Sequence, residues 1–159
     1  MANNLARAAF YLAGSALVAG GAGAWAVITQ QLKSQQIEVH EDSDILAGKQ
    51  VAGPVSAFAQ ANVIEQHALG MGGGRTFADI SHEWMEAQAA GDAARVEELA
   101  GTRQMVLQAN LLRASLFTSV LAYGVAALAG GMGILTVLVG ATLPKNAALP
   151  TVAILPADD

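Results

Sequence analysis

Residues 114–144 read ASLFTSVLAYGVAALAGGMGILTVLVGATLP, a stretch of about thirty residues without a charged side chain. A helix rises about 1.5 Å per residue, so about 20 apolar residues cross the roughly 30 Å hydrocarbon layer of a bilayer. The run ILTVLV over 134–139 is denser in large apolar side chains than a soluble core helix usually is. The stretch therefore predicts a transmembrane helix over 114–143, tilted or partly protruding.

A second uncharged segment covers residues 8–28, near the other end of the chain, and it also has the length of one crossing. It is less hydrophobic because Ala and Gly outnumber Leu, Val and Ile. Its alternative interpretation is a cleaved secretory signal, with Arg7 as the charged flank and Ala22-Gly23-Ala24 or Ala24-Trp25-Ala26 as the cleavage site. The apolar stretch is longer than a typical signal core, which favours a first transmembrane helix within residues 1–29.

Small residues recur at every fourth position in both segments. Ala16, Gly20 and Ala24 form this row in the first segment, and Ala122, Ala126 and Gly130 form it in the second. Such rows let two helices approach closely in lipid, where van der Waals packing drives association. We therefore expect an antiparallel hairpin packed through these residues, although an Ala-rich chain also produces such rows by chance. Near Gly130, Gly131 and Gly133 we expect either a kink or a tight helix contact.

Composition excludes several classes of partner and site. The formal net charge is −5 and the chain has only eight Lys and Arg residues, which argues against nucleic acid as a partner. It has no cysteine, so disulfides, thiolate metal sites and cysteine nucleophiles are excluded. Scarce aromatic residues and abundant Ala and Gly favour closely packed helices.

The polar segment between the apolar stretches is expected to form a mainly helical extramembrane domain over 30–113. Ile37 to His40 alternates apolar and polar residues, which indicates a short strand or extended segment. Helices are predicted over 55–69, from Asp79 or Ser81 to Gly91, and from 93 through 113 into the second span. The 55–69 helix should bury one face, which carries Val55, Phe58, Ala59, Asn62 and Val63. The whole chain is thus predicted to be an all-α membrane protein with a tail over 144–159, in which Pro150 and Pro156 exclude regular helix.

The orientation of the chain in the membrane is predicted from the long segment between the two apolar stretches. Arg7 and Lys145 flank the spans on the terminal side, and Lys33, Arg103 and Arg113 flank them on the loop side, so positive charge near the spans does not decide the orientation. Long loops translocate largely regardless of charge, and residues 29–113 carry eleven acidic against six basic side chains. We therefore expect both termini in the cytoplasm and the central domain outside a bacterial plasma membrane.

Local motifs predict no catalytic, cofactor-binding or metal-binding residue. His40, His67 and His82 lack metal-ligand spacing, so only clustering in the fold would bring them together. Glu65 and His67 are two apart on a helix and point in different directions. Residues 72–75, GGGR, lack the Lys-Ser/Thr of a phosphate loop and are predicted to be a turn.

Three residues are candidates for the membrane interface. Trp25 and Arg113 are predicted anchors at the ends of the spans, because an amphipathic ring and a long cationic side chain both favour the headgroup region. Tyr123 lies inside the second span and should find a polar partner for its hydroxyl.

Five short stretches carry a resemblance to a known family: Leu46-Ala47-Gly48-Lys49, Gly53-Pro54, His67-Ala68-Leu69, Gly74 to Ala78, and above all Leu112 to Ser119. Over about residues 37–133 the chain resembles small actinobacterial two-helix membrane proteins that often carry the label aromatic ring-opening dioxygenase. Enzymes of that name are soluble and hold iron with histidines and a carboxylate, so the label looks misassigned. The resemblance implies topology and a bacterial lineage but no catalytic residues; this chain departs from it around Glu83 to Glu98 and after Pro144.

These observations favour a non-catalytic accessory or structural subunit of a larger plasma-membrane assembly, with actinobacterial respiratory-chain complexes as an analogy for the host. Membrane lipids and other membrane-protein subunits are then the expected partners, and no cofactor is expected. The alternative is an extracytoplasmic sensor that binds a small ligand in a pocket near Phe58, Phe77 and Trp84. A membrane oxygenase ranks third.

Overall fold

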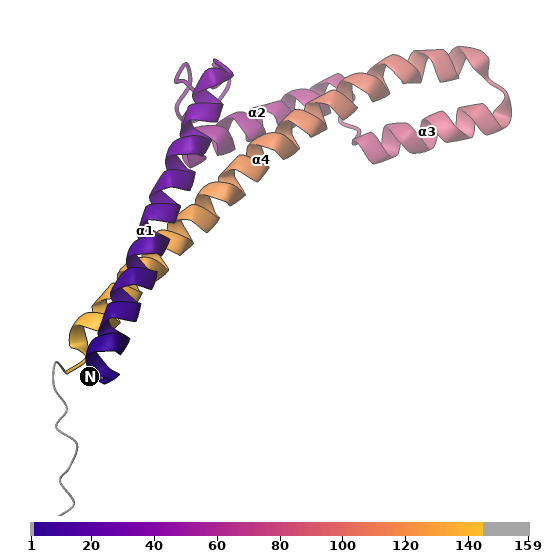
Figure 1. The fold of residues 1–159 in the computed structure, drawn as a ribbon. Coiled ribbons are helices and arrows are strands. Elements are labelled where there is room, and N and C mark those ends of the chain that lie inside the picture. Colours follow the sequence, from indigo (N-terminus) through magenta and orange to yellow (C-terminus); the bar gives the residue numbers. More distant parts are fainter. Residues whose placement is uncertain (1, 145–159) are drawn as a thin grey trace, which may run out of the picture. The chain divides into compact units, whose positions relative to one another are not determined.

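The computed structural model describes residues 2–144, and within them the chain is all-helical apart from loops and one isolated β-bridge (Figure 1). The helices, in chain order, are α1 (Ala2–Ser34), α2 (Pro54–Met71), α3 (Phe77–Ala90) and α4 (Ala93–Thr142). The predicted all-α class is confirmed. The predicted tail, with Lys145, Pro150 and Pro156, lies outside the described residues.

Helices α1 and α4 are each long and apolar enough to span a membrane. Only 11% of the most apolar window in α1 and 17% of that in α4 is buried within the chain. The core helix of a soluble protein is mostly buried, whereas these two helices expose most of their apolar residues.

Helix α4 continues for 50 residues from the polar segment into the apolar one, as predicted. The glycines at 101, 124, 130, 131, 133 and 140 lie within it. Each of them weakens helix propensity, but many of the residues between them are Ala and Leu, which are good helix formers. Of the kink or the tight contact expected near residue 130, the structure shows the tight contact.

Contacts divide the chain into two units. One consists of Met1–Gly23 with Ala126–Asp159, and the other of Ala24–Val125. The division falls inside both apolar helices, and Trp25 and Tyr123 pack against each other within the larger unit. The limits at 29/30 and 113/114 were predicted from hydropathy, which a division by contacts does not test, and they stay predictions.

In the smaller unit, α1 packs on α4 through glycines whose backbones touch (Figure 1). A Cβ atom added to Gly14 would lie 2.7 Å from the carbonyl oxygen of Gly133 and 2.9 Å from the nitrogen of Val137. A Cβ added to Gly133 would lie 2.6 Å from the carbonyl oxygen of Gly14. Neither position has room for a side chain, so the two glycines set the distance between the helices.

The same contact repeats toward both ends of the unit. A Cβ on Gly21 would lie 2.6 Å from the carbonyl oxygen of Ala126 and 2.8 Å from the nitrogen of Gly130, and one on Gly140 would lie 2.8 Å from Cβ of Phe10. Rising numbers on α1 meet falling numbers on α4, so the segments run antiparallel. The small residues in contact are seven apart, at 14 and 21 on α1 and at 126, 133 and 140 on α4, which is the spacing of a left-handed helix pair.

The small-residue rows predicted at every fourth position lie differently relative to the helix contact on α1 and on α4. Ala16, Gly20 and Ala24 are exposed, and a Cβ on Gly20 would meet nothing within 4 Å. The α1 contact is made instead by Gly14 and Gly21, on an adjacent face.

On α4, the predicted row lies closer to the contact. Ala126 is buried, Gly130 touches Gly21 through its backbone, and Ala122 is half-buried within the larger unit.

Arg7 closes the end of the smaller unit. Its guanidinium donates hydrogen bonds to the carbonyl oxygens of Leu143 and, at 3.4 Å, of Ala141, beyond and within the last turn of α4. These carbonyls have no partner inside the helix, and the helix dipole places partial negative charge there. The cation therefore stabilises the C-terminal end of α4.

In the larger unit, α2 supplies small buried residues to the main core. Pro54 lies in its first turn as predicted, and the hydroxyl of Ser56 accepts hydrogen bonds from the backbone N–H of Ala52 and Gly53 at 3.0 and 3.1 Å. The helix runs two residues past the predicted end, to Met71.

The buried face of α2 agrees with the predicted one at Ala59 and Val63 and differs from it elsewhere. It is made of Ser56, Ala57, Ala59, Ala61, Val63 and Ala68. Val55 and Phe58, which we expected to be buried, are 58% and 43% exposed. Most of the buried side chains of α2 are alanines. Such small side chains let α2 pack against its neighbours more closely than large side chains would allow.

The loop from α1 to α2 folds back on itself. Residues Glu38 and Gln50 form an antiparallel bridge, and Val51 donates to Ile37 across it at 2.8 Å. Val39 and Val51 point into the core and are 1% and 0% exposed. The expected extended segment is confirmed as a bridge.

We expect a leucine to be accepted at Gly20 and rejected at Gly14. Gly14→Leu places a side chain against the backbone of α4 and should destabilise the folded protein by about 1–3 kcal/mol. Gly20→Leu meets open space and serves as the matched control. The midpoint of thermal unfolding in mild detergent measures both, and equal midpoints for the two variants would contradict the glycine contact.

Candidate functional site

Tyr123 joins three segments of the larger unit. Its ring is 1% exposed and packs edge-to-face on Trp25 with centroids 4.6 Å apart. Its hydroxyl lies 2.7 Å from Oγ1 of Thr29 and donates to the carbonyl oxygen of Ala52 at 3.4 Å. We expected a polar partner for the hydroxyl of Tyr123. The structure provides two, Thr29 on α1 and the carbonyl oxygen of Ala52 in the loop before α2.

The two predicted interface anchors have partners within the chain. Trp25 is 41% exposed beside Tyr123. Arg113 pairs with Glu65 of α2 at 2.8 Å, and its guanidinium lies 5.2 Å from the ring centroid of Phe117. The pair holds α2 against α4, and anchoring at a membrane surface stays a prediction for both residues.

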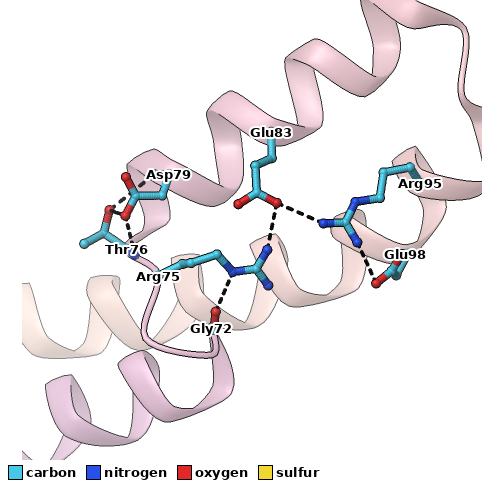
Figure 2. A network of polar contacts seen from close by, with 7 residues as sticks. All are labelled: Gly72, Arg75, Thr76, Asp79, Glu83, Arg95 and Glu98. Carbon is cyan, nitrogen blue, oxygen red and sulfur yellow. Dashed lines mark hydrogen bonds and ion pairs between the residues drawn. The ribbon is translucent and has the colours of Figure 1, made fainter.

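The turn between α2 and α3 starts a charged network that links α3 to α4 (Figure 2). One carboxylate oxygen of Glu83 accepts from Arg75 at 2.7 Å and from Arg95 of α4 at 3.0 Å. Arg75 also donates to the carbonyl oxygen of Gly72 at 2.8 Å, while Arg95 pairs with Glu98 at 2.8 Å. Residues 72–75 thus form a turn, as predicted, and Gly73 and Gly74 have positive φ angles of 64° and 81°.

A small apolar cluster lies beside this network. Ile80 of α3 packs with Leu99 and Val106 of α4, and all three are at most 2% exposed. The guanidinium of Arg103 covers the cluster, 5.3 Å from the ring of Phe77 and 4.9 Å from that of Trp84. These cation–π contacts add to the apolar packing between α3 and α4.

Helix α3 is capped by Thr76 before its first residue and by Gly91 after its last. The hydroxyl of Thr76 accepts from the backbone N–H of Asp79, and the carboxylate of Asp79 accepts from the backbone N–H of Thr76 at 2.8 Å. This capping box satisfies free donors at the helix start, where we had expected Asp79 or Ser81 to be the cap. Gly91, with φ 71°, ends the helix at the predicted position.

Two pKa values are shifted in this region. The hydrogen bonds with the side chain and backbone of Thr76 hold the pKa of Asp79 below its ordinary value. The hydrogen bond with Glu98 raises the pKa of Arg95, which is charged at every relevant pH in any case.

Phe58, Phe77 and Trp84, near which we expected a pocket, do not share one pocket in the described part of the chain, although Phe77 lines a hollow of about 350 Å³ between α2, the following turn and α4. Phe58 packs on Phe117 with centroids 5.8 Å apart, beside the main core. Phe77 and Trp84 belong to the smaller cluster under Arg103. An open groove of about 290 Å³ lies elsewhere, between α2 and α4, and Ile64, His67, Met71, Met105 and Leu112 are among its lining residues.

Two of the three histidines lie together in the fold, although their spacing in the sequence is not that of a metal site. Nε2 of His67 is 2.8 Å from Oδ2 of Asp42, Nδ1 of His40 is 3.2 Å from the same oxygen, and the imidazole centroids are 4.7 Å apart. These three ligand atoms all lie within 4.8 Å of one another, so the residues could hold a metal ion. His82 is apart from them and pairs with Glu86 on α3.

The main chain around His40 fixes this cluster. The backbone N–H of His40 donates to Oε1 of Gln60 on α2 at 2.8 Å, and that of Asp42 donates to Nδ1 of His40 at 3.2 Å. His67 projects from α2 toward Asp42, whereas Glu65 turns to Arg113, as their spacing predicted. The loop is thereby tied to α2 at two points.

Comparison with known proteins gives no relative. No family model, no curated protein and no solved structure matches the chain.

We expect the capping box to weaken in acid. Because the pKa of Asp79 is lower in the folded than in the unfolded chain, its carboxylate stabilises the fold above about pH 4, and the effect is lost as the pH falls through the folded pKa. Asp79→Asn and Thr76→Ala should lower stability near neutral pH, and their difference from the natural chain should shrink with decreasing pH. Thr76→Ser is the control, because it keeps the hydroxyl. Urea unfolding between pH 2 and 6 measures this, and a difference independent of pH would contradict it.

Proposed function

We propose that this chain is a two-helix membrane protein in which α1 and the C-terminal part of α4 cross the bilayer as an antiparallel hairpin. The observation that carries the proposal is the outward surface of these helices. Its large apolar side chains are exposed to between 53% and 74%: Leu12, Leu128, Met132, Ile134, Leu135 and Leu138. In water this surface would cost about 25 cal/mol per Å², whereas lipid accommodates it.

The contacts between Gly14, Gly21 and α4 support retention of the first segment. Both glycines precede the possible cleavage sites around Ala24, so cleavage would remove the partner of the α4 glycines. We propose that α1 serves as a permanent anchor in a bacterial plasma membrane.

Our proposed topology places both termini in the cytoplasm and α2, α3 and the polar part of α4 outside. The acidic excess of the central segment supports it, since long loops of this kind translocate.

Within the membrane, we propose that the hairpin is a non-catalytic accessory subunit bound to a larger assembly, with respiratory-chain complexes as the analogy. Ala16, Gly20 and Ala24 support this role, because they form a small-residue row that the contact with α4 leaves exposed. A second helix could approach α1 closely along this row. The larger unit has an exposed apolar surface of its own, because Leu111, Leu112 and Met105 are exposed to between 47% and 62%.

Single cysteines test the topology without background, because the chain has none of its own. We expect Met85→Cys in α3 to react with a membrane-impermeant maleimide in intact cells. Asn4→Cys and Pro144→Cys, at the two ends of the hairpin, should react only after permeabilisation. Reaction of all three in intact cells, or protection of Met85→Cys with labelling of the other two, would contradict the proposed arrangement.

Co-purification tests the accessory role. Solubilised gently from its own membranes, the chain should migrate on a native gel in a complex well above its own mass, with other subunits in fixed ratio. Gly20→Leu should lose them while keeping its unfolding midpoint, and Ala22→Leu, on another exposed face of α1, should retain them. A lone chain of unchanged migration in all three samples would overturn the proposal.

A further inference from the structure

We propose that His40, Asp42 and His67 form a binding site for one divalent transition-metal ion of the Zn²⁺ class. The site lies in the central unit, where the loop after α1 meets α2. It is independent of the proposed accessory role, because it involves neither the hairpin nor any other subunit.

The distances suit a shared ion. Zn²⁺ binds His nitrogen and carboxylate oxygen at about 2.0–2.2 Å, so neighbouring ligand atoms of a tetrahedral ion lie about 3.3 Å apart. Oδ2 of Asp42 is 2.8 Å from Nε2 of His67 and 3.2 Å from Nδ1 of His40, and all three atoms lie within 4.8 Å of one another. The two pairs that share Oδ2 of Asp42 are within about half an ångström of this spacing, and rotation of the exposed imidazoles has to close the third pair from as much as 4.8 Å.

The hydrogen bond at His40 leaves Nδ1 without a proton. The backbone N–H of Asp42 donates to Nδ1 of His40 at 3.2 Å, so this nitrogen carries its lone pair. The carboxylate oxygen of Asp42 faces the same nitrogen at 3.2 Å, and two acceptor atoms this close repel each other. An ion that coordinates both atoms removes the repulsion and replaces the backbone N–H of Asp42 on the lone pair of Nδ1.

The surroundings provide both rigidity and charge. The hydrogen bond from the backbone N–H of His40 to Gln60 fixes the loop against α2, the helix that carries His67. Glu41 and Asp44 flank the site in sequence, and their negative charge raises the local concentration of cations. The loop is therefore preorganised before an ion arrives.

The ligand set indicates the class of metal. Two imidazoles and one carboxylate suit Zn²⁺ and its neighbours rather than Ca²⁺ or Mg²⁺, which prefer oxygen ligands. The three side chains are between 42% and 62% exposed, so water can complete the coordination sphere. The site is thus open on its solvent side.

Zn²⁺ binding by the purified full-length chain, in detergent and with any affinity tag removed, tests the proposal. Equilibrium dialysis with metal analysis should give one Zn²⁺ per chain. His67→Ala, Asp42→Asn and His40→Gln should each lower the affinity at least about tenfold. His82→Ala is the matched control, because it removes an exposed histidine outside the cluster and should bind as the natural chain does.

Co²⁺ provides a second measurement that reports the ligands directly. Its visible absorption should show nitrogen coordination in the natural chain and in His82→Ala, and lose it in His67→Ala. Circular dichroism verifies that the variants are folded, and His67→Gln replaces His67→Ala if the latter is not. Equal Zn²⁺ affinity in the natural chain and the His67 variant, or no binding by the natural chain, would overturn the proposal.

Discussion

Two helices packed on each other cannot bury themselves, and the structure depends on this constraint. Along the contact of α1 with α4 the backbones touch at Gly14 and Gly133. Each helix therefore buries this one face against the other. The remaining faces carry leucine, isoleucine and valine with no protein over them in the described part of the chain. In the proposed arrangement these faces are covered by lipid or by another subunit, and burying them there is favourable by about 25 cal/mol per Å² of apolar surface.

The helices could be predicted from the sequence, but the faces through which they make contact could not. Uncharged length predicted both apolar helices, and Pro54 and Gly91 marked a helix start and a helix end. The face of α1 was missed because Ala and Gly occupy so many of its positions that rows at every fourth residue exist on several sides. Only the partner helix selects among them, and here it selects the seven-residue spacing of Gly14 and Gly21.

The histidine cluster shows a different limit. His40 and His67 are far apart in the sequence, and no motif connects them. They meet because Val39 and Val51 enter the core from opposite arms of the loop, and because Gln60 holds the backbone of His40. The HxD pattern at 40–42 was the one local signal, and it acquires meaning only once α2 is placed beside it.

Helix α3 is attached more weakly than the rest of its unit. Ile80, Leu99 and Val106 form its fully buried contact, and partly exposed ion pairs of Glu83 add little each. Such a segment can open as a separate cooperative unit while the core around Tyr123 stays closed. Its backbone amides would then exchange with solvent well before those of α2, and a protease would cut the chain first between Gly72 and Gly91.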